Sequence, residues 1–300
     1  PKKVKPFLKW AGGKTQLLGD IENKFPYKKT DTFTYVEPFV GSGAVLFWVL
    51  NNFPNLKSAV INDINEDLIN SYKTIKLNVV DLIPVLKTYE NEYHFLTEKK
   101  EEKKKYYYNK RELFNTRTSN SIIQTALFIF LNRACFNGLY RVNKKNGFNV
   151  PIGSYKKPKI CDEGNLLLMS ESLKKVEILS GDFEKTVSYA SENTIFYFDP
   201  PYKPLSETSS FNSYTKKDFN DEEQIRLKKF CDKLDSSGVK WILSNSDVKC
   251  KNPNDDFFDD LFSEYQINRV MAKRSINSNP SKRGQLTELL ISNQGACNAI

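Results

Sequence analysis

The sequence predicts an α/β fold, in which a mostly parallel sheet is closed by antiparallel strands and interrupted by an inserted domain. Short apolar segments alternate with helical ones over residues 34–71 and 176–246, which is typical of β-α-β units. Two more apolar segments, 265–272 and 286–293, flank a polar loop and indicate a closing antiparallel pair.

The inserted domain is predicted from a change in composition. Lysine, tyrosine and asparagine dominate residues 72–170, which include a helical stretch at 121–136. Residues 137–155, NGLYRVNKKNGFNVPIGSY, place turn signals between short β-prone runs and indicate a β-hairpin. We therefore assign residues 1–71 and 171–300 to one domain and 72–170 to a mainly helical insert.

The first β-α-β unit begins with the strand TYVEP, residues 34–38, which leads into a glycine loop at 39–43. Residues 44–52, AVLFWVLNN, have helical composition, and SAVIND at 58–63 is a second apolar strand. The chain returns to this style after the insert with strands at 176–183 and 193–202.

An amphipathic helix is predicted over residues 221–238, ended by Gly238, and the strand VKWILSNS follows at 239–246. Together these segments complete the predicted sheet.

The composition restricts the class of function. A formal net charge of +9 is compatible with a polyanionic partner, although a solvated basic surface explains it equally well. His94 is the only histidine, which excludes Ser-His-Asp, Cys-His and HExxH sites. No apolar run is long enough to cross a membrane, and we see no secretory signal, so we expect a cytoplasmic protein. Five scattered cysteines without a CxxC pair indicate free thiols and no metal site: Cys135, Cys161, Cys231, Cys250 and Cys297.

The glycine loop after the first strand indicates a nucleoside site. It runs from Glu37 through Phe39, Gly41 and Gly43, and Asp63 ends the next strand 22 residues after Gly41. An acid at this position can accept hydrogen bonds from ribose hydroxyls. The loop lacks the complete GxGxxG of dinucleotide sites, so S-adenosylmethionine fits better. A tight turn with a helix-capping Asp is the structural alternative.

Residues 7–18, FLKWAGGKTQLL, contain Gly-Lys-Thr, but they do not form a phosphate loop, because Leu8 stands where that motif needs glycine. We therefore exclude an NTPase. Trp10 offers a flat wall for an adenine or a sulfonium, Gly12 permits close approach, and Lys14 can pair with a carboxylate such as that of a methionine moiety. A helix start with an exposed lysine explains the stretch equally well.

A carboxylate, two prolines and a tyrosine follow the apolar strand ending at residue 198: Asp199, Pro200, Pro201 and Tyr202. The prolines end the strand at the edge where α/β sheets bind ligands, and they hold the backbone rigid. Asp199 and the carbonyl of Pro200 can accept both hydrogens of an exocyclic amine and favour the pyramidal nitrogen that attacks a methyl group. Tyr202 supplies a stacking face for a base swung out of a duplex. A plain strand-ending turn is the alternative.

In this order, the motifs resemble the D12 class of DNA adenine N6-methyltransferases, of the Dam type and in the α arrangement. The resembling segments are KWAGGK, EPFVGSGAVLF, INDINEDLIN, NRACFNGLYRVNKKNGFNVPIGSYKKPKI, GDF, YFDPPY and RSINSNPSKRGQLTELLISN. The resemblance implies a Rossmann-like methyltransferase sheet with a DNA-recognition insert. It also implies that S-adenosylmethionine is bound by Trp10, Lys14, Asp63, Asp182 and Asp199, helped by the loop at Phe39, Gly41 and Gly43. Asp182 matches a contact to the cofactor adenine.

The resemblance further implies that the hairpin segment reads GATC through Phe136, Asn137, Leu139, Arg141 and Pro151. Phe136 falls where an aromatic side chain wedges into the base stack, and Asn137 helps to hold the opened site. Arg141 falls where an arginine reads guanine, and an arginine at a hairpin tip can bind guanine O6 and N7 together. An ordinary solvated hairpin is the alternative. Further candidate DNA contacts are Arg133, Arg274, Lys282 and Arg283.

The predicted function is site-specific DNA adenine N6-methylation in GATC on bacterial chromosomal or plasmid DNA, with methyl transferred from S-adenosylmethionine to a flipped adenine and without a metal. We expect a restriction-modification system, with a cognate endonuclease acting on the same site; a solitary, mismatch-repair-type methylase is the alternative.

Two other classes remain open. One is an RNA adenine or protein amide methyltransferase, against which the long basic insert argues. The other is a non-catalytic DNA-binding regulator, against which the intact Asp199, Asp63 and Gly41 argue.

Overall fold

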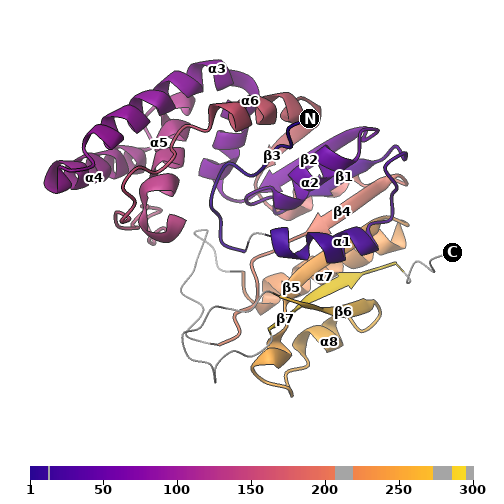
Figure 1. Cartoon of the computed structure of the whole chain (residues 1–300). Helices are drawn as coiled ribbons and strands as arrows, with labels where there is room; N and C mark the ends of the chain where they lie inside the picture. Colours follow the sequence, from indigo (N-terminus) through magenta and orange to yellow (C-terminus); the bar gives the residue numbers. More distant parts are fainter. Residues whose placement is uncertain (13, 207–218, 273–285, 295–300) are drawn as a thin grey trace.

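The computed structural model of this chain describes residues 1–12, 14–206, 219–272 and 286–294. Its centre is a seven-stranded sheet in the order β3-β2-β1-β4-β5-β7-β6 (Figure 1). The strands are β1 (Thr34–Glu37), β2 (Ser58–Asp63), β3 (Val176–Ser180), β4 (Thr194–Phe198), β5 (Lys240–Ser246), β6 (Gln266–Met271) and β7 (Thr287–Ser292). β1 to β5 run parallel, and β7 lies antiparallel between β5 and β6. The predicted fold class, including the closing antiparallel pair, is confirmed.

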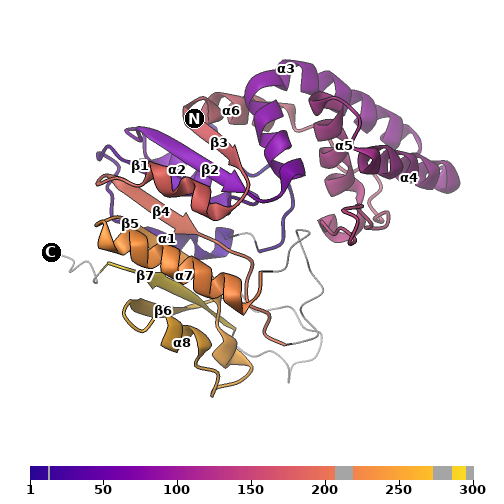
Figure 2. The ribbon, with the colours of Figure 1, turned by 180° about the vertical axis from the view of Figure 1, so that it is seen from behind.

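The central strands are apolar because both faces of the sheet are covered. Every residue of β4 is buried. One core cluster includes Tyr35, Ile61 and Tyr197 and packs with the helices α1 (Leu18–Lys24) and α2 (Ala44–Asn52). A second cluster holds the side chains of the opposite face. It packs with α7 (Asp221–Ser236) and α8 (Phe257–Leu261), and α7 lies in front of the sheet in Figure 2.

The chain between β2 and β3 is mainly helical. It contains α3 (Glu66–Phe95), α4 (Lys100–Thr116), α5 (Ser121–Ala134) and α6 (Glu163–Ser172). Ten of the side chains of α5 are buried, and the helix packs against both α3 and α4. The proposed boundary between residues 71 and 72 lies inside α3, whose first turns pack in the same core cluster as the sheet.

Within the residues that the structure describes, five short 3-10 helices join these elements: Thr15–Leu17, Phe136–Gly138, Leu173–Lys175, Phe183–Tyr189 and Val248–Cys250.

The predicted hairpin at 137–155 is an irregular loop with hairpin-like pairing. Two isolated antiparallel bridges, Cys135↔Ile152 and Val142↔Phe148, hold its two sides together. The amide of Asn143 donates to the carbonyl of Gly147 at 2.9 Å, which closes the tip. The pairing stops at single bridges, so no strand ladder forms within this segment.

Among the described residues, no helix combines the length and the apolar character needed to span a bilayer. Within the same part of the chain, no group of three or more His, Cys, Asp or Glu side chains is arranged to hold a metal ion. The four described cysteines, Cys135, Cys161, Cys231 and Cys250, are free thiols, whereas Cys297 lies outside the described residues.

Candidate active site

Three acidic residues meet at the carboxyl edge of the sheet. Glu37 ends β1, Asp63 ends β2, and Asp199 follows β4. In the register of these neighbouring parallel strands, Val36 pairs with both Val60 and Phe196, so the three acids leave the sheet at the same edge. Ligands of open α/β sheets bind in this position.

Glu37 is the most buried of the three. Its side chain is only 2% exposed, and Tyr35 Oη donates a hydrogen bond of 2.5 Å to Oε1. Burial raises the pKa of Glu37 well above its usual range, and the nearby Asp199 and Asp63 act in the same direction. Burial therefore favours the uncharged form of Glu37 at this edge of the sheet.

The glycine loop closes on Asp63. The amide of Gly41 donates to Asp63 Oδ2, and the amide of Asn65 donates to Oδ1, both at 3.0 Å. Gly41 and Gly43 have φ values of 51° and 79°, a region that favours glycine. A Cβ on Gly43 would lie 2.7 Å from the hydroxyl oxygen of Tyr72, so only glycine fits. Burial raises the pKa of Asp63 to about 6, although its hydrogen bonds from backbone amides oppose the rise.

Lys14 joins this edge from the N-terminal segment. Its side chain is buried, so the alternative of an exposed lysine is wrong. Nζ lies 3.2 Å from Asp199 Oδ1, donates to the carbonyl of Gly12 at 2.6 Å, and sits 4.0 Å from the centre of the Tyr202 ring. The expectation that Lys14 pairs with a carboxylate therefore applies, in this structure, to the carboxylate of Asp199.

Burial and the ion pair with Lys14 have opposite effects on the pKa of Asp199. Burial raises the pKa of Asp199 from 3.8 to about 6, and the Lys14 ammonium opposes that rise. The side chain is still 22% exposed, so a ligand can reach it. Ser244 Oγ lies 3.4 Å from Oδ1. The arrangement places a partly accessible carboxylate beside an aromatic ring at the strand end.

Three residues that sequence reasoning missed hold the segment after Asp199. Gln224 Nε2 donates to the carbonyl of Pro201 at 3.0 Å, and Gln224 Oε1 accepts from Asn245 Nδ2 at 3.0 Å. The hydroxyl of Tyr202 donates to Glu288 Oε2 at 2.8 Å. The sequence offered two signals for these residues. Polar residues end the apolar strand VKWILSNS, and a glutamine lies on the apolar face of α7, the helix before that strand.

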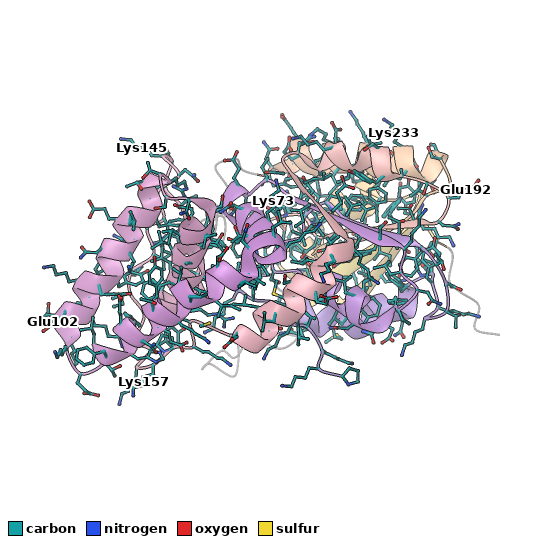
Figure 3. All side chains as sticks on the ribbon, turned by 90° about the horizontal axis from the view of Figure 1, so that it is seen from above. Lys73, Glu102, Lys145, Lys157, Glu192 and Lys233 are labelled. Atoms are coloured by element: carbon teal, nitrogen blue, oxygen red, sulfur yellow. The ribbon has the colours of Figure 1, made fainter. Side chains whose placement is uncertain are left out.

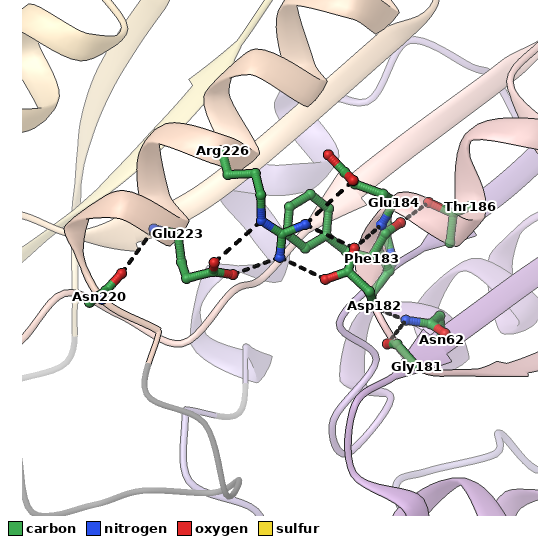
Figure 4. Close-up of polar contacts among 10 residues, drawn as sticks. Asn62, Gly181, Asp182, Phe183, Glu184, Thr186, Asn220, Glu223 and Arg226 are labelled. Carbon is green, nitrogen blue, oxygen red and sulfur yellow. Dashed lines mark hydrogen bonds and ion pairs between the residues drawn. The ribbon is translucent and has the colours of Figure 1, made fainter.

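Asp182 is bound by an arginine of α7 (Figure 4). Arg226 Nη2 lies 2.6 Å from Asp182 Oδ1, and Nη1 lies 2.9 Å from Oδ2. The guanidinium also lies over the ring of Phe183, which contacts the ring of Phe39 at a centroid distance of 5.4 Å. Sequence reasoning proposed Asp182 and Phe39 as cofactor contacts but missed Arg226, because no local motif marks it.

The predicted DNA contacts of the loop are at the surface. Phe136 is 49% exposed, and Asn137, Arg141 and Pro151 are exposed as well. Asn137 has a φ of 53°, and Leu139 is half-buried. Arg141 Nε donates to Asn149 Oδ1 at 2.8 Å, which extends its guanidinium along the loop.

The other basic residues that we proposed as DNA contacts do not belong to this exposed loop. Arg133 is half-buried and donates to the carbonyl of Phe7 at 2.7 Å. It is therefore not exposed in the way that the loop residues Phe136 and Arg141 are. Arg274, Lys282 and Arg283 lie outside the described residues. Lys145 and Lys157 lie on the helical side of the molecule, away from Glu192 and Lys233 (Figure 3).

A parallel sheet that is closed by one antiparallel strand, with its polar site at the carboxyl edge, defines a Rossmann-like α/β protein. Residues 10–276 match the D12 class N6 adenine-specific DNA methyltransferase family, and the chain belongs to that family. It is an adenine-specific DNA methyltransferase.

Curated relatives match almost the whole chain. It is 51% identical to the Type II methyltransferase M.MjaIII of Methanocaldococcus jannaschii, over 97% of this chain and 99% of that protein. It is 39% identical to the Type II methyltransferase M1.LlaDCHI of Lactococcus lactis, over 97% and 96% of the two chains. The DNA adenine methylase of Haemophilus influenzae is 36% identical, over 96% and 93%.

Proposed function

We propose that the protein transfers a methyl group from S-adenosylmethionine to the exocyclic amine of a flipped adenine in GATC sites of double-stranded DNA. The single observation that carries this proposal is the meeting of Asp199, Lys14 and Tyr202 beside the Gly41–Asp63 contact.

The residues at the carboxyl edge suit this cofactor. The carboxylate of Asp199 and the ring of Tyr202 lie together at this edge, and both kinds of group attract a positive charge such as that of a sulfonium. Asp63 would bind the ribose hydroxyls, and the amide of Gly41 holds its carboxylate in place. Trp10, Gly12 and Glu37 would line the pocket, while Asp182 and Phe39 would contact the adenine. Bound there, the sulfonium supplies an activated methyl group.

Asp199 and its neighbours would activate the target amine. The lone pair of an adenine N6 is delocalised into the ring, so the amine is a poor nucleophile. The carboxylate of Asp199 and the carbonyl of Pro200 would accept its two hydrogens and favour a pyramidal nitrogen. Pro201 and Gln224 hold this backbone before the substrate arrives, which is the preorganisation that electrostatic catalysis needs. Tyr202 would stack on the base, and the extra proton leaves the nitrogen only after transfer.

The loop at 136–151 would open and read the DNA. Phe136 would enter the base stack, Asn137 would hold the opened site, and Arg141 would bind a guanine in the major groove. Leu139 and Pro151 would complete the surface that contacts the bases. The exposure of Phe136 and Arg141 supports this role.

The names of the relatives support two biological settings. Two of them are named Type II methyltransferases, which supports a role beside a restriction endonuclease that cuts the same site. Others are named DNA adenine methylases, so a solitary enzyme is the second setting.

The decisive experiment is to methylate an unmodified plasmid in vitro with S-adenosylmethionine and to map modified adenines at single-base resolution. We expect modification at the adenine of GATC and none in a transcript of the same sequence. Modification of another sequence would reject GATC, and modification of the transcript alone would reject DNA as the substrate. A matched reaction with Arg141→Ala should lose discrimination at one guanine by about 1–3 kcal/mol.

A further inference from the structure

We propose that Tyr140 is a specificity-determining positioning residue, which links the DNA-reading loop to the cofactor pocket so that correct DNA contacts strengthen cofactor binding. This inference rests on the proposed function, because it assumes that residues 136–151 read DNA and that Trp10 and Asp63 line the cofactor site.

Tyr140 points inward while its neighbour in the loop points outward. Its side chain is 6% exposed, whereas the adjacent Arg141 is exposed. A shift of the backbone at Arg141 on binding a base must therefore move or strain the buried ring of Tyr140. Through this ring, a DNA contact at Arg141 can change the packing between the loop and the rest of the protein.

One face of Tyr140 lies on the cofactor side. Its ring stacks on the indole of Trp10, with centroids 5.2 Å apart and planes inclined by 29°. Trp10 in turn lies against the glycine loop, because a Cβ built on Gly41 would be 3.3 Å from the indole. Contacts therefore run from the reading loop through two aromatic rings to the turn that binds Asp63.

The hydroxyl of Tyr140 makes a second link. It donates to Asp67 Oδ2 at 3.2 Å, and Arg117 pairs with both oxygens of Asp67 at 3.1 and 2.9 Å. Asp67 lies in the first turn of α3, two residues after the N-cap Asn65, whose amide binds Asp63. The two links from Tyr140 thus lead to the glycine loop and to the start of α3, where the two amides that bind Asp63 lie.

Binding energy is shared in both directions between two linked sites. If the ring of Tyr140 carries the coupling, cognate DNA must tighten the cofactor by the same factor by which the cofactor tightens cognate DNA. A tyrosine that only filled space would affect stability and leave this factor unchanged. A coupling role and a space-filling role for Tyr140 therefore predict different results when this factor is measured.

The test compares Tyr140→Leu with Tyr140→Phe and with Tyr93→Leu. Tyr93 is also fully buried, but it packs among Tyr106 and Phe130 in the helical part, so it controls for lost packing. S-adenosylhomocysteine binding is measured by calorimetry with and without a duplex that carries the mapped site. The ratio of kcat/KM between that duplex and one with a single changed base pair is measured in parallel.

In the wild type, we expect the duplex to tighten S-adenosylhomocysteine about tenfold. Tyr140→Leu should bring this factor close to one and lower the discrimination ratio at least about fivefold. Tyr140→Phe keeps the stack but loses the bond to Asp67, so it should reduce both effects measurably, by less than Tyr140→Leu. Tyr93→Leu should keep both effects despite a lower unfolding temperature.

A Tyr140→Leu protein with wild-type coupling and discrimination would overturn the inference, as would equal losses in Tyr93→Leu or a wild type without coupling. If Tyr140→Leu does not fold, Tyr140→Phe decides, because loss of its bond to Asp67 should still reduce the coupling measurably. A wild-type protein that neither binds S-adenosylhomocysteine nor methylates DNA would instead reject the proposed function.

Discussion

Lys14 Nζ lies 3.2 Å from Asp199 Oδ1 and 4.0 Å from the centre of the Tyr202 ring. One buried ammonium therefore contacts both the carboxylate and the aromatic face of the DPPY segment. Burial disfavours the ionised form of Asp199, and the positive charge of Lys14 favours it. Since the amine of the substrate needs the carboxylate form, this ion pair sets the pH range of the proposed reaction.

The wild-type rate should fall at acidic pH. The pKa of Asp199 is raised to about 6, so the carboxylate is present above that pH and protonated below it. Asp63 has a pKa raised to about 6 as well, and protonation there should weaken binding of the cofactor. We expect kcat to rise through about pH 6 and to level off above it, while the KM for the cofactor increases on the acid side. Steady-state profiles test this, and a kcat independent of pH across this range would contradict it.

Lys14→Met should move the acidic limb of the kcat profile to higher pH. Removing the ammonium leaves the burial of Asp199 without its main opposing charge, so the pKa of Asp199 rises further. The profile is measured at saturating cofactor, because Lys14 is also a proposed cofactor contact. Lys14→Arg keeps a positive charge and is the matched control. An unchanged midpoint in Lys14→Met would show that the pair does not control this ionisation.

Asp199→Ala should abolish methylation and leave DNA affinity largely intact. The substitution removes the acceptor of the amine hydrogens but leaves the exposed reading loop unchanged. We expect a fall in kcat of at least about a thousandfold, of the size seen when a preorganised polar group is lost. Single-turnover assays with labelled methyl donor measure the rate, and fluorescence anisotropy measures DNA binding. Retained turnover would reject the role of Asp199.

Gln224→Leu should lower both stability and kcat. Gln224 is 2% exposed, and its loss leaves the fully buried Asn245 Nδ2 without the oxygen that accepts its hydrogen bond. An unsatisfied buried donor costs about 1–3 kcal/mol, which thermal unfolding should detect. Loss of the bond to the Pro201 carbonyl should lower kcat about tenfold, with little change in the KM for DNA.

Gln224→Glu is the matched variant, because it keeps an oxygen for Asn245 but removes the donor to Pro201. We expect it to lower kcat and to lower stability at least as much as Gln224→Leu, because an ionised carboxylate would be buried against the carbonyl oxygen of Pro201. Equal kcat in the wild type and both variants would show that the Pro201 carbonyl needs no support.

Much of the fold is local in origin and was predicted for that reason. Strands such as β4 are continuous apolar runs, and β4 ends at Phe198, just before Asp199 and the two prolines. The glycines at 41 and 43 and the acid at 63 belong to one β-α-β unit, whose geometry follows from short-range sterics. The change in composition at residue 72 does not coincide with the end of an element, because the helix α3 continues through it from Glu66 to Phe95.

The sequence by itself determined the succession of strand, glycine turn, helix and strand in the first β-α-β unit, and the acidic, proline-rich segment after β4, since each depends on neighbours in the chain. The tertiary structure alone decided that Lys14 pairs with Asp199, that Arg226 binds Asp182, and that Tyr140 stacks on Trp10. These partners come from distant segments, and each charged or aromatic side chain has many possible partners in the sequence. Packing of the two core clusters selects one partner, because burial makes every unsatisfied polar group costly.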